Sequence, residues 1–222
     1  MSIRSIATAL CTGLLLGIMP LAAPAGIGLD VTPAKLDMSI APGVTENLPI
    51  TVRNGTDTNV HVQAQLVDFT LTTAGDYQFM KPGTLSTSLM RYAAVNPREF
   101  DLPAGTLQQV KLSIIMPAGG LEGEYAGIVF FQTRPDRHGG GAVAFSTRVA
   151  SKIYETIPGT VKLAGAISDV VALPLPEGER YRVTFKNTGN AHVYLDGHLE
   201  VKRDGNAIET IPLPHQALVE RG

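Results

Sequence analysis

A run of alternating side chains from Ala142 to Pro158 most constrains what this chain can fold into. Apolar residues occupy one parity through most of the run, at Val143, Phe145, Val149, Ile153 and Ile157. That period of two is typical of a half-buried strand and not of a helix. The run is about three times as long as a common strand of roughly five or six residues. We therefore expect one long strand, preceded by a glycine loop and ended by Pro158-Gly159.

The rest of the chain predicts an all-β protein. Short strands recur about every ten residues with turn chemistry between them, and helical periodicity is almost absent after the first 25 residues. This spacing is typical of β-sandwiches such as immunoglobulin-like domains. We expect one such domain over residues 26–158 and a second over residues 159–222. The second range is short for a sandwich of about 100 residues, so we expect an incomplete second domain. Either the chain is a fragment or stops early, which we favour, or this domain is truncated and borrows strands from elsewhere.

The N-terminus has the pattern of a secretory signal peptide. A basic start precedes an apolar segment from Ala7 to Leu21, and small residues around Ala25 predict cleavage before Gly26. The apolar segment is shorter than the roughly 20 residues of a spanning helix, and we expect no membrane span in the sequence. Cleavage would remove Cys11, the only cysteine, so the mature protein would have no disulfide. We expect a periplasmic or secreted protein.

Individual strands can be assigned from alternation and turn residues. We expect an edge strand at 28–38, because Pro33 cannot donate to a ladder. The alternating runs at 48–52 and 60–66 predict a hairpin or a pair of strands that switches sheets. The segment 86–95 predicts a strand or one helical turn. The segment 125–131, apolar on both parities, predicts a central strand covered on both faces. The second unit contributes expected strands at 163–173, 181–186, 192–202 and one beginning at Ile208, with a hairpin turn at Asp204-Gly205.

No motif in the chain predicts catalysis. The sequence has no nucleophile elbow and no phosphate-binding loop, and its histidines lack metal-binding spacing, so we expect surface histidines at positions 61, 138, 192, 198 and 215. Glu122 and Glu124 could share a strand face as a glycosidase-like pair, although solvated charges at a strand entrance are the simpler interpretation. A formal net charge of −2 with scattered positive residues favours neither nucleic acid nor an anionic membrane. We expect no enzyme activity, no metal and no cofactor.

Binding through a sheet edge remains as a function. An exposed edge can accept a strand from a partner, with main-chain hydrogen bonds supplying affinity. Arg148 and Lys152 lie on the polar parity of the Ala142–Pro158 run, where they could contact such a partner. The alternative is that they are ordinary edge charges that discourage aggregation.

Several short motifs resemble those of the periplasmic pilus-assembly chaperones, the PapD-like family. Phe100-x-Leu102-x-x-Gly105, followed by Val110-Lys-Leu-Ser-Ile114, resembles a strand entry of that family. Ser151-Lys152-Ile153-Tyr154 is similar to the lysine–leucine–phenylalanine–tyrosine run in the last strand of its first domain. The turn Asn187-Thr-Gly-Asn190 is similar to one in its second domain and in surface proteins with tandem immunoglobulin-like domains.

The resemblance implies two immunoglobulin-like domains at an angle and a partner held by strand addition. It implies that the last strand of domain one lends apolar side chains to an incomplete pilus subunit, here Val143, Phe145, Val149 and Ile153. It also implies a lysine and an arginine that hold the subunit's terminal carboxylate. Lys152 falls on the lysine position, whereas Pro33 stands at the arginine position and Lys35, two residues on, shares its face. The arginine–glutamate–serine motif of the family is replaced by Gly123-Glu124-Tyr125-Ala126.

Two functions remain open from the sequence. The first is a chaperone-like protein that binds an extended or C-terminal segment of a pilus or surface-protein subunit. The second is a cell-surface structural or adhesion module of tandem immunoglobulin-like domains.

Overall fold

The fold is built almost entirely from strands. A computed structural model describes residues 28–72, 75–135, 146–176, 178–214 and 217–221. Within these ranges the helical structure is one 3-10 turn, η1 (Leu89–Arg91), and no helix there is long and apolar enough to cross a membrane. The all-β prediction is confirmed.

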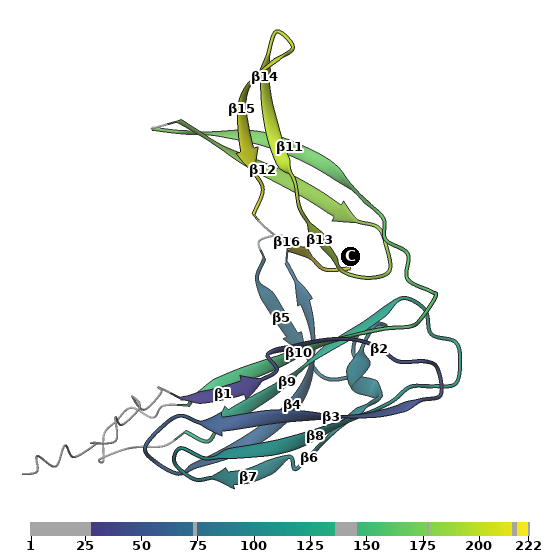
Figure 1. The fold of residues 1–222 in the computed structure, drawn as a ribbon, viewed down its shortest axis with the longest axis vertical. Helices are drawn as coiled ribbons and strands as arrows, with labels where there is room; N and C mark the ends of the chain where they lie inside the picture. The colour runs from purple at the N-terminus through teal and green to yellow at the C-terminus, as the bar shows by residue number, and fades with distance from the viewer. Residues whose placement is uncertain (1–27, 73–74, 136–145, 177, 215–216, 222) are drawn as a thin grey trace, which may run out of the picture.

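Two sheets pack face to face in the first unit (Figure 1). One sheet has the order β1-β3-β8-β6, and the other has the order β2-β10-β9-β4-β5 with β7 also paired to β4. The first sheet contains β1 (Leu29–Thr32), β3 (Thr45–Asn54), β8 (Leu107–Ile115) and β6 (Ala93–Asn96). The second contains β2 (Lys35–Ser39), β10 (Arg148–Thr156), β9 (Glu124–Thr133), β4 (Val60–Leu71), β5 (Tyr77–Met80) and β7 (Glu99–Leu102).

The core between these sheets follows the expected alternation. Val52 and Leu112 from one sheet and Phe131 and Ile153 from the other are fully buried in one apolar cluster. β9 is buried on both faces, because its other parity, including Ile128 and Phe130, packs into a second apolar cluster. The prediction of a doubly covered central strand is confirmed.

The N-terminal strand differs from the prediction. The expected strand at 28–38 is two strands, since β1 pairs antiparallel with β3 and β2 pairs parallel with β10. The division falls at Pro33, which has no N–H to continue a ladder. The chain therefore crosses from one sheet to the other at this proline.

The structure resolves three assignments that alternation left open or placed wrongly. β3 and β4 lie in different sheets, so they form the sheet-switching pair and not a hairpin. The segment 86–95 contains both η1 and β6. The expected strand 192–202 is divided into β13 (Val193–Leu195) and β14 (His198–Arg203), with Gly197 between them.

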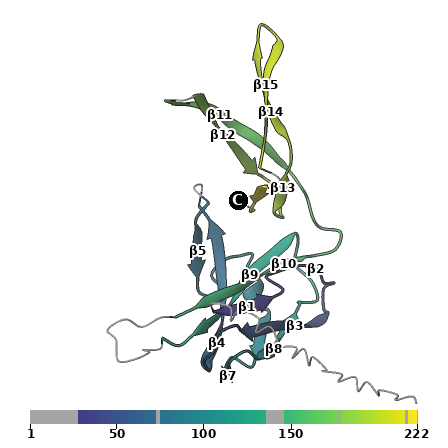
Figure 2. The ribbon, with the colours of Figure 1, turned by 60° about the vertical axis from the view of Figure 1, so that its left-hand side comes forward.

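The second unit consists of three two-stranded sheets (Figure 2). β11 (Gly165–Leu175) pairs with β12 (Gly178–Asn187), β13 pairs with β16 (Ala217–Val219), and β14 pairs with β15 (Asn206–Pro212) across the expected turn at Asp204-Gly205. Among the described residues after Thr160, Asn187 and Ala191 alone are buried. This unit therefore has little apolar core of its own among the described residues.

Candidate functional site

The candidate site lies on the outer face of the six-stranded sheet, beneath the second unit (Figure 1). Strand β10 sends Ile153 into the core, while Lys152 and Tyr154 belong to the opposite parity. Tyr154 packs there with Phe69, Ile128 and Phe130 in the second apolar cluster. This outer face therefore combines aromatic surface with a lysine.

Lys35 and Lys152 are brought together by the sheet. They are register partners in the parallel pair of β2 and β10. Both ammonium groups lie over the ring of Tyr154, with Nζ 4.9 Å from the ring centroid for Lys35 and 5.2 Å for Lys152. Contacts of this kind attract a cation to the electron-rich face of the ring. The two lysines that the sequence selected thus form one cationic site.

The ammonium of Lys152 contacts residues far away in the sequence. Its Nζ donates to the hydroxyl of Tyr77 at 2.7 Å and lies 3.6 Å from Oε1 of Glu220. The side chains of Lys152 and Glu220 are only 17% and 14% exposed. A carboxylate from the second unit therefore already contacts the lysine of the first.

Lys35 has a separate set of partners. Its Nζ lies 2.8 Å from Oδ2 of Asp37 and donates to the hydroxyl of Tyr194 in β13. It also lies 4.6 Å from the centroid of the Tyr194 ring. Each lysine is thus linked to a different part of the second unit.

Tyr154 joins these contacts at the centre. Its hydroxyl donates to Oε1 of Glu220, and its ring lies 4.2 Å from the ring of His192 between centroids. Burial and, next, the hydrogen bond to Glu220 raise the pKa of the Tyr154 hydroxyl far above its usual range. Tyr154 therefore stays protonated and acts as a hydrogen-bond donor.

A buried acid–imidazole contact lies beside Tyr154. Nδ1 of His192 is 2.5 Å from Oε2 of Glu124, and the backbone N–H of His192 donates to Oε1 at 3.1 Å. The two side chains are 11% and 4% exposed. The expectations of a surface histidine at 192 and of a solvated carboxylate at 124 are therefore wrong, because the two side chains contact each other where the first and second units meet.

The other histidines and Glu122 agree only in part with the prediction that they are exposed surface residues. The side chain of Glu122 is 72% exposed and that of His198 is 56% exposed. His61 is partly covered and contacts Asp101 and Glu99 on β7. His138 and His215 lie outside the described residues. The residues that the structure describes include no group of three or more acidic, histidine or cysteine side chains that could hold a metal.

Strand β10 is shorter than the predicted run and is only partly an edge. Its pairs with β2 begin at Lys152, so the segment Lys152–Thr156 has a neighbour on each side. Within the described residues, the segment Arg148–Ser151 pairs with β9 alone. The expected free edge is thus confined, within β10, to this segment, which we name the open edge. Val143 and Phe145 lie outside the described residues.

The predicted apolar contact residues on β10 face the core. Ile153 is fully buried in the first cluster, and Val149 packs against that cluster. Arg148 instead lies on the outer face, where its guanidinium is 4.4 Å from the centroid of the Phe130 ring and 5.8 Å from that of Phe79. A partner at the open edge would meet Arg148 and the backbone before Val149 or Ile153.

An aromatic strip continues from Arg148 along β5. The rings of Tyr77 and Phe79 are nearly parallel, with centroids 5.9 Å apart, and both side chains are 43% exposed. This strip was not predicted from the sequence, although the alternation of Tyr77 and Phe79 in a short strand was a usable signal. Glu220 and Tyr194 were not predicted either, since no local pattern exists for residues that act only through the approach of the second unit.

Comparisons with known proteins agree with this fold. Residues 34–133 match the family model described as "WxL Interacting Protein, peptidoglycan binding domain". No curated protein matches significantly. Among solved structures, the crystal structure of the class 5 fimbriae chaperone CfaA is 12% identical, with a TM-score of 0.53 over 87% of this chain and 82% of that one.

A second solved structure is similar in the same way. It is the CsuC–CsuE chaperone-tip adhesion subunit pre-assembly complex from the archaic chaperone-usher Csu pili of Acinetobacter baumannii. It is 10% identical, with a TM-score of 0.50 over 87% of this chain and 86% of that one. At such identities the likeness concerns the fold, which is the PapD-like arrangement of immunoglobulin-like sandwiches.

Proposed function

We propose that this protein is an extracytoplasmic, non-enzymatic binding protein that receives an extended segment of a partner protein at the open edge of β10. The partner strand would lie beside Arg148–Ser151 and continue the six-stranded sheet. Its terminal carboxylate would approach Lys152 and Lys35. The N-terminal signal pattern supports a periplasmic or secreted location.

The observation that carries this proposal is that Arg148–Ser151 has no strand partner, among the described residues, on the side away from β9. The N–H of Thr133 donates to the carbonyl of Thr147, so odd-numbered residues of β10 exchange hydrogen bonds with β9. Even-numbered residues face the other way, as the hydrogen bond from Lys152 N–H to the carbonyl of Ala34 confirms. The backbone groups of Arg148 and Ala150 therefore face away from β9 and can pair with an added strand.

The two lysines support the proposal that the terminal carboxylate of the partner binds here. The ammonium of Lys152 already contacts one carboxylate, that of Glu220, in a largely covered position. This ammonium and the Tyr154 hydroxyl both contact Oε1 of that carboxylate. Charge-assisted contacts of this type are stronger than neutral hydrogen bonds. The same groups are suited to a partner's terminal carboxylate.

The test uses synthetic peptides of alternating valine and serine with either a free or an amidated C-terminus. We expect the wild-type protein to bind the free acid about tenfold more tightly than the amide, and Lys152→Ala to abolish that preference while the fold is kept. Lys111→Ala, on the exposed side of β8, is the matched control. Equal binding of acid and amide by the wild type would overturn the carboxylate role.

The strand-addition step has its own variant. Ala150→Pro removes an N–H that faces away from β9, and proline is tolerated where no ladder bond is lost. We expect this variant to fold and to lose binding of both peptides. Retained binding by a folded Ala150→Pro protein would show that the open edge is not used.

A second candidate function is peptidoglycan binding by the first unit. The match of residues 34–133 to a peptidoglycan-binding family model favours it, and that range includes the exposed, parallel rings of Tyr77 and Phe79. Aromatic rings of this kind can stack on sugars. Co-sedimentation with purified peptidoglycan tests it, with Tyr77→Ala/Phe79→Ala as the variant and the peptides above as competitors. Sedimentation that needs both rings would support this function.

A further inference from the structure

The edge of β4 contains a gap in its hydrogen-bond ladder. On the side away from β9, β7 pairs with Val60–Gln63 and β5 pairs with Asp68–Leu71. The N–H of Ala64 also donates to the carbonyl of Arg98. On that side, Gln65–Val67 have no strand partner among the described residues. The gap is therefore about three residues long, or roughly 10 Å at strand spacing.

The parity of β4 fixes which backbone groups face the gap. The N–H of Arg134 donates to the carbonyl of His61, so odd-numbered residues of β4 bond to β9. Leu66 has the opposite parity, and both its N–H and its C=O face the gap. Unpaired strand groups of this kind are a template for another chain.

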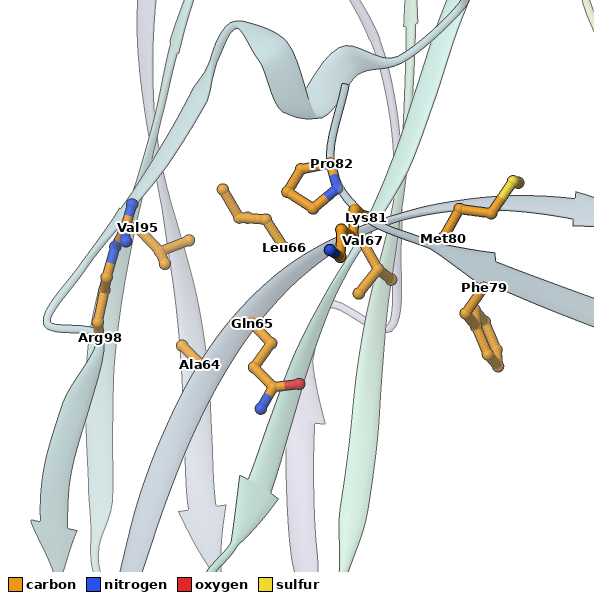
Figure 3. Close-up of a pocket in the computed structure, with 10 residues that line it drawn as sticks. All are labelled: Ala64, Gln65, Leu66, Val67, Phe79, Met80, Lys81, Pro82, Val95 and Arg98. Atoms are coloured by element: carbon orange, nitrogen blue, oxygen red, sulfur yellow. The ribbon is translucent and has the colours of Figure 1, made fainter. Parts of the chain in front are cut away.

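A pocket of about 530 Å³ occupies the gap (Figure 3). This volume lies in the range of small-ligand sites. Figure 3 shows Leu66 and Val67 between Arg98 and Val95 on one side and Phe79 and Met80 on the other, with Pro82 above. The walls are thus largely apolar, and the floor offers a backbone donor and acceptor.

Two cations flank this pocket without an acidic partner. Lys81 and Arg98 both line it, both are exposed, and neither side chain has an ion pair or hydrogen bond among the described residues. The nearby carboxylate of Glu99 is already in contact with Gln63, His61 and Arg134. The charge of the pocket is therefore complementary to an anionic group.

We propose that this pocket binds a short extended peptide segment that carries an acidic side chain. Its main chain exchanges two hydrogen bonds with Leu66, its apolar side chains contact Phe79, Pro82 and Val95, and its carboxylate lies between Lys81 and Arg98. The site is separate from the open edge, because β4 and β10 lie on opposite sides of β9. It would give the protein a second peptide-binding site in the same sheet.

The probe is acetyl-Val-Asp-Val-amide, titrated into ¹⁵N-labelled full-length protein. We expect a saturable shift of the Leu66 amide signal, and about tenfold weaker binding for each of Lys81→Glu and Arg98→Glu, because each reversal replaces a charge-assisted contact with repulsion. Lys111→Glu, on β8 in the other sheet, is the matched charge-reversal control and should bind as the wild type does. Circular dichroism verifies that each variant is folded.

Two further probes separate the components of the site. The asparagine peptide, acetyl-Val-Asn-Val-amide, should bind about tenfold more weakly, and a peptide N-methylated at its central residue should not shift Leu66. Equal binding of the aspartate and asparagine peptides, or binding unaffected by both charge reversals, would overturn the proposal. Binding of a muropeptide fragment at Leu66 that the aspartate peptide cannot displace would overturn it in favour of a glycan. Ala150→Pro should leave this site intact, so failure here and failure at the open edge can be distinguished.

Discussion

Lys35 and Lys152 are direct neighbours across the parallel pair of β2 and β10, although 117 positions separate them in the chain. Two like charges opposite each other on one face would repel. Here Lys35 contacts Asp37 and Lys152 contacts Glu220, and the ring of Tyr154 lies close to both ammonium groups. The positive charges of the two lysines are thus neutralised by Asp37, which lies on β2 with Lys35, and by Glu220 of the second unit.

This arrangement predicts that Glu220 competes with a partner's carboxylate. Glu220→Gln removes the charge that contacts Lys152 but keeps the size of the side chain. If the proposed peptide binding is correct, the free-acid peptide should bind about fivefold more tightly to this variant, which corresponds to about 1 kcal/mol, the value of a modest ion pair. Isothermal titration measures the change. Glu200→Gln, whose exposed carboxylate contacts Lys202, is the control.

An unchanged affinity of the Glu220→Gln variant would contradict this prediction. It would mean that the carboxylate of the peptide does not use the Lys152 position. The amidated peptide should bind both proteins equally, and it therefore serves as an internal control.

His192 should contribute measurably to stability. His192→Ala removes the contact with Glu124 and the ring contacts with Tyr154 and Tyr194, and it leaves a covered carboxylate with fewer partners. We expect the free energy of unfolding to fall by about 2–3 kcal/mol. Because the chain has no tryptophan, urea unfolding is followed by circular dichroism.

The exposed His198 provides the comparison for that experiment. Its side chain is 56% exposed, so His198→Ala should change the free energy of unfolding by less than about 0.5 kcal/mol. Equal effects of the two substitutions would show that the contact between His192 and Glu124 does not hold the second unit.

The sequence predicted the sheets better than it predicted the site. Alternation is a local property, so the strand at 125–131 could be predicted as covered on both faces, and the structure buries it on both. The cationic site could be found only in part. Lys35 and Lys152 were selected by resemblance and parity, but their partners Glu220 and Tyr194 come from strands whose approach no periodicity encodes.

The incorrect predictions for Glu124, His192 and the free edge of β10 have a shared physical origin. Glu124 and His192 are polar residues at positions that alternation treats as surface, and each becomes buried because it satisfies the other. The free edge was overestimated for a similar reason, since the parallel pairing of β2 with β10 depends on a crossing at Pro33 that connects two sheets. Long-range pairing of this kind has no signature in a single run of residues.

Gly123 should be intolerant of a side chain. Its φ is +73°, and an added Cβ would lie 2.5 Å from the carbonyl oxygen of Asn190 in the second unit. Gly123→Ala therefore combines backbone strain with a clash, and we expect a loss of about 3 kcal/mol or more in the free energy of unfolding. Thermal unfolding gives the measurement.

The same substitution at Gly120 distinguishes the cost of backbone strain from the cost of the clash at Gly123. The φ of Gly120 is +82°, but an added Cβ would meet nothing within 4 Å. Gly120→Ala should therefore cost only the strain, about 1–2 kcal/mol. Equal losses in the free energy of unfolding for the two variants would mean that the loop at Asn190 moves away freely. That result would contradict a close contact between Gly123 and the second unit.

Glu155 should make stability depend on pH. This carboxylate is fully buried, its Oε1 accepts the N–H of Ile40 at 2.5 Å, and its Oε2 has no hydrogen-bond partner within the described part of the chain. Burial raises the pKa of Glu155 to about 7 from an ordinary value of 4.5, and the Ile40 hydrogen bond opposes part of this increase. The folded state therefore holds a proton that the unfolded state releases at lower pH. The contribution of Glu155 to stability is full below pH 4.5, falls as the pH rises to about 7, and is lost above that value.

Replacing the carboxylate by an amide should remove this dependence. Glu155→Gln keeps an acceptor for Ile40 and cannot ionise, so above pH 7.5 the variant should be more stable than the wild type by up to about 3 kcal/mol, the equivalent of the pKa difference. Near pH 4.5 the two proteins should have similar free energies of unfolding. Urea unfolding at several pH values gives the difference curve, and Glu122→Gln, with an exposed side chain, should give a flat one. A Glu155→Gln curve that is equally flat would show that Glu155 is solvated in the folded protein.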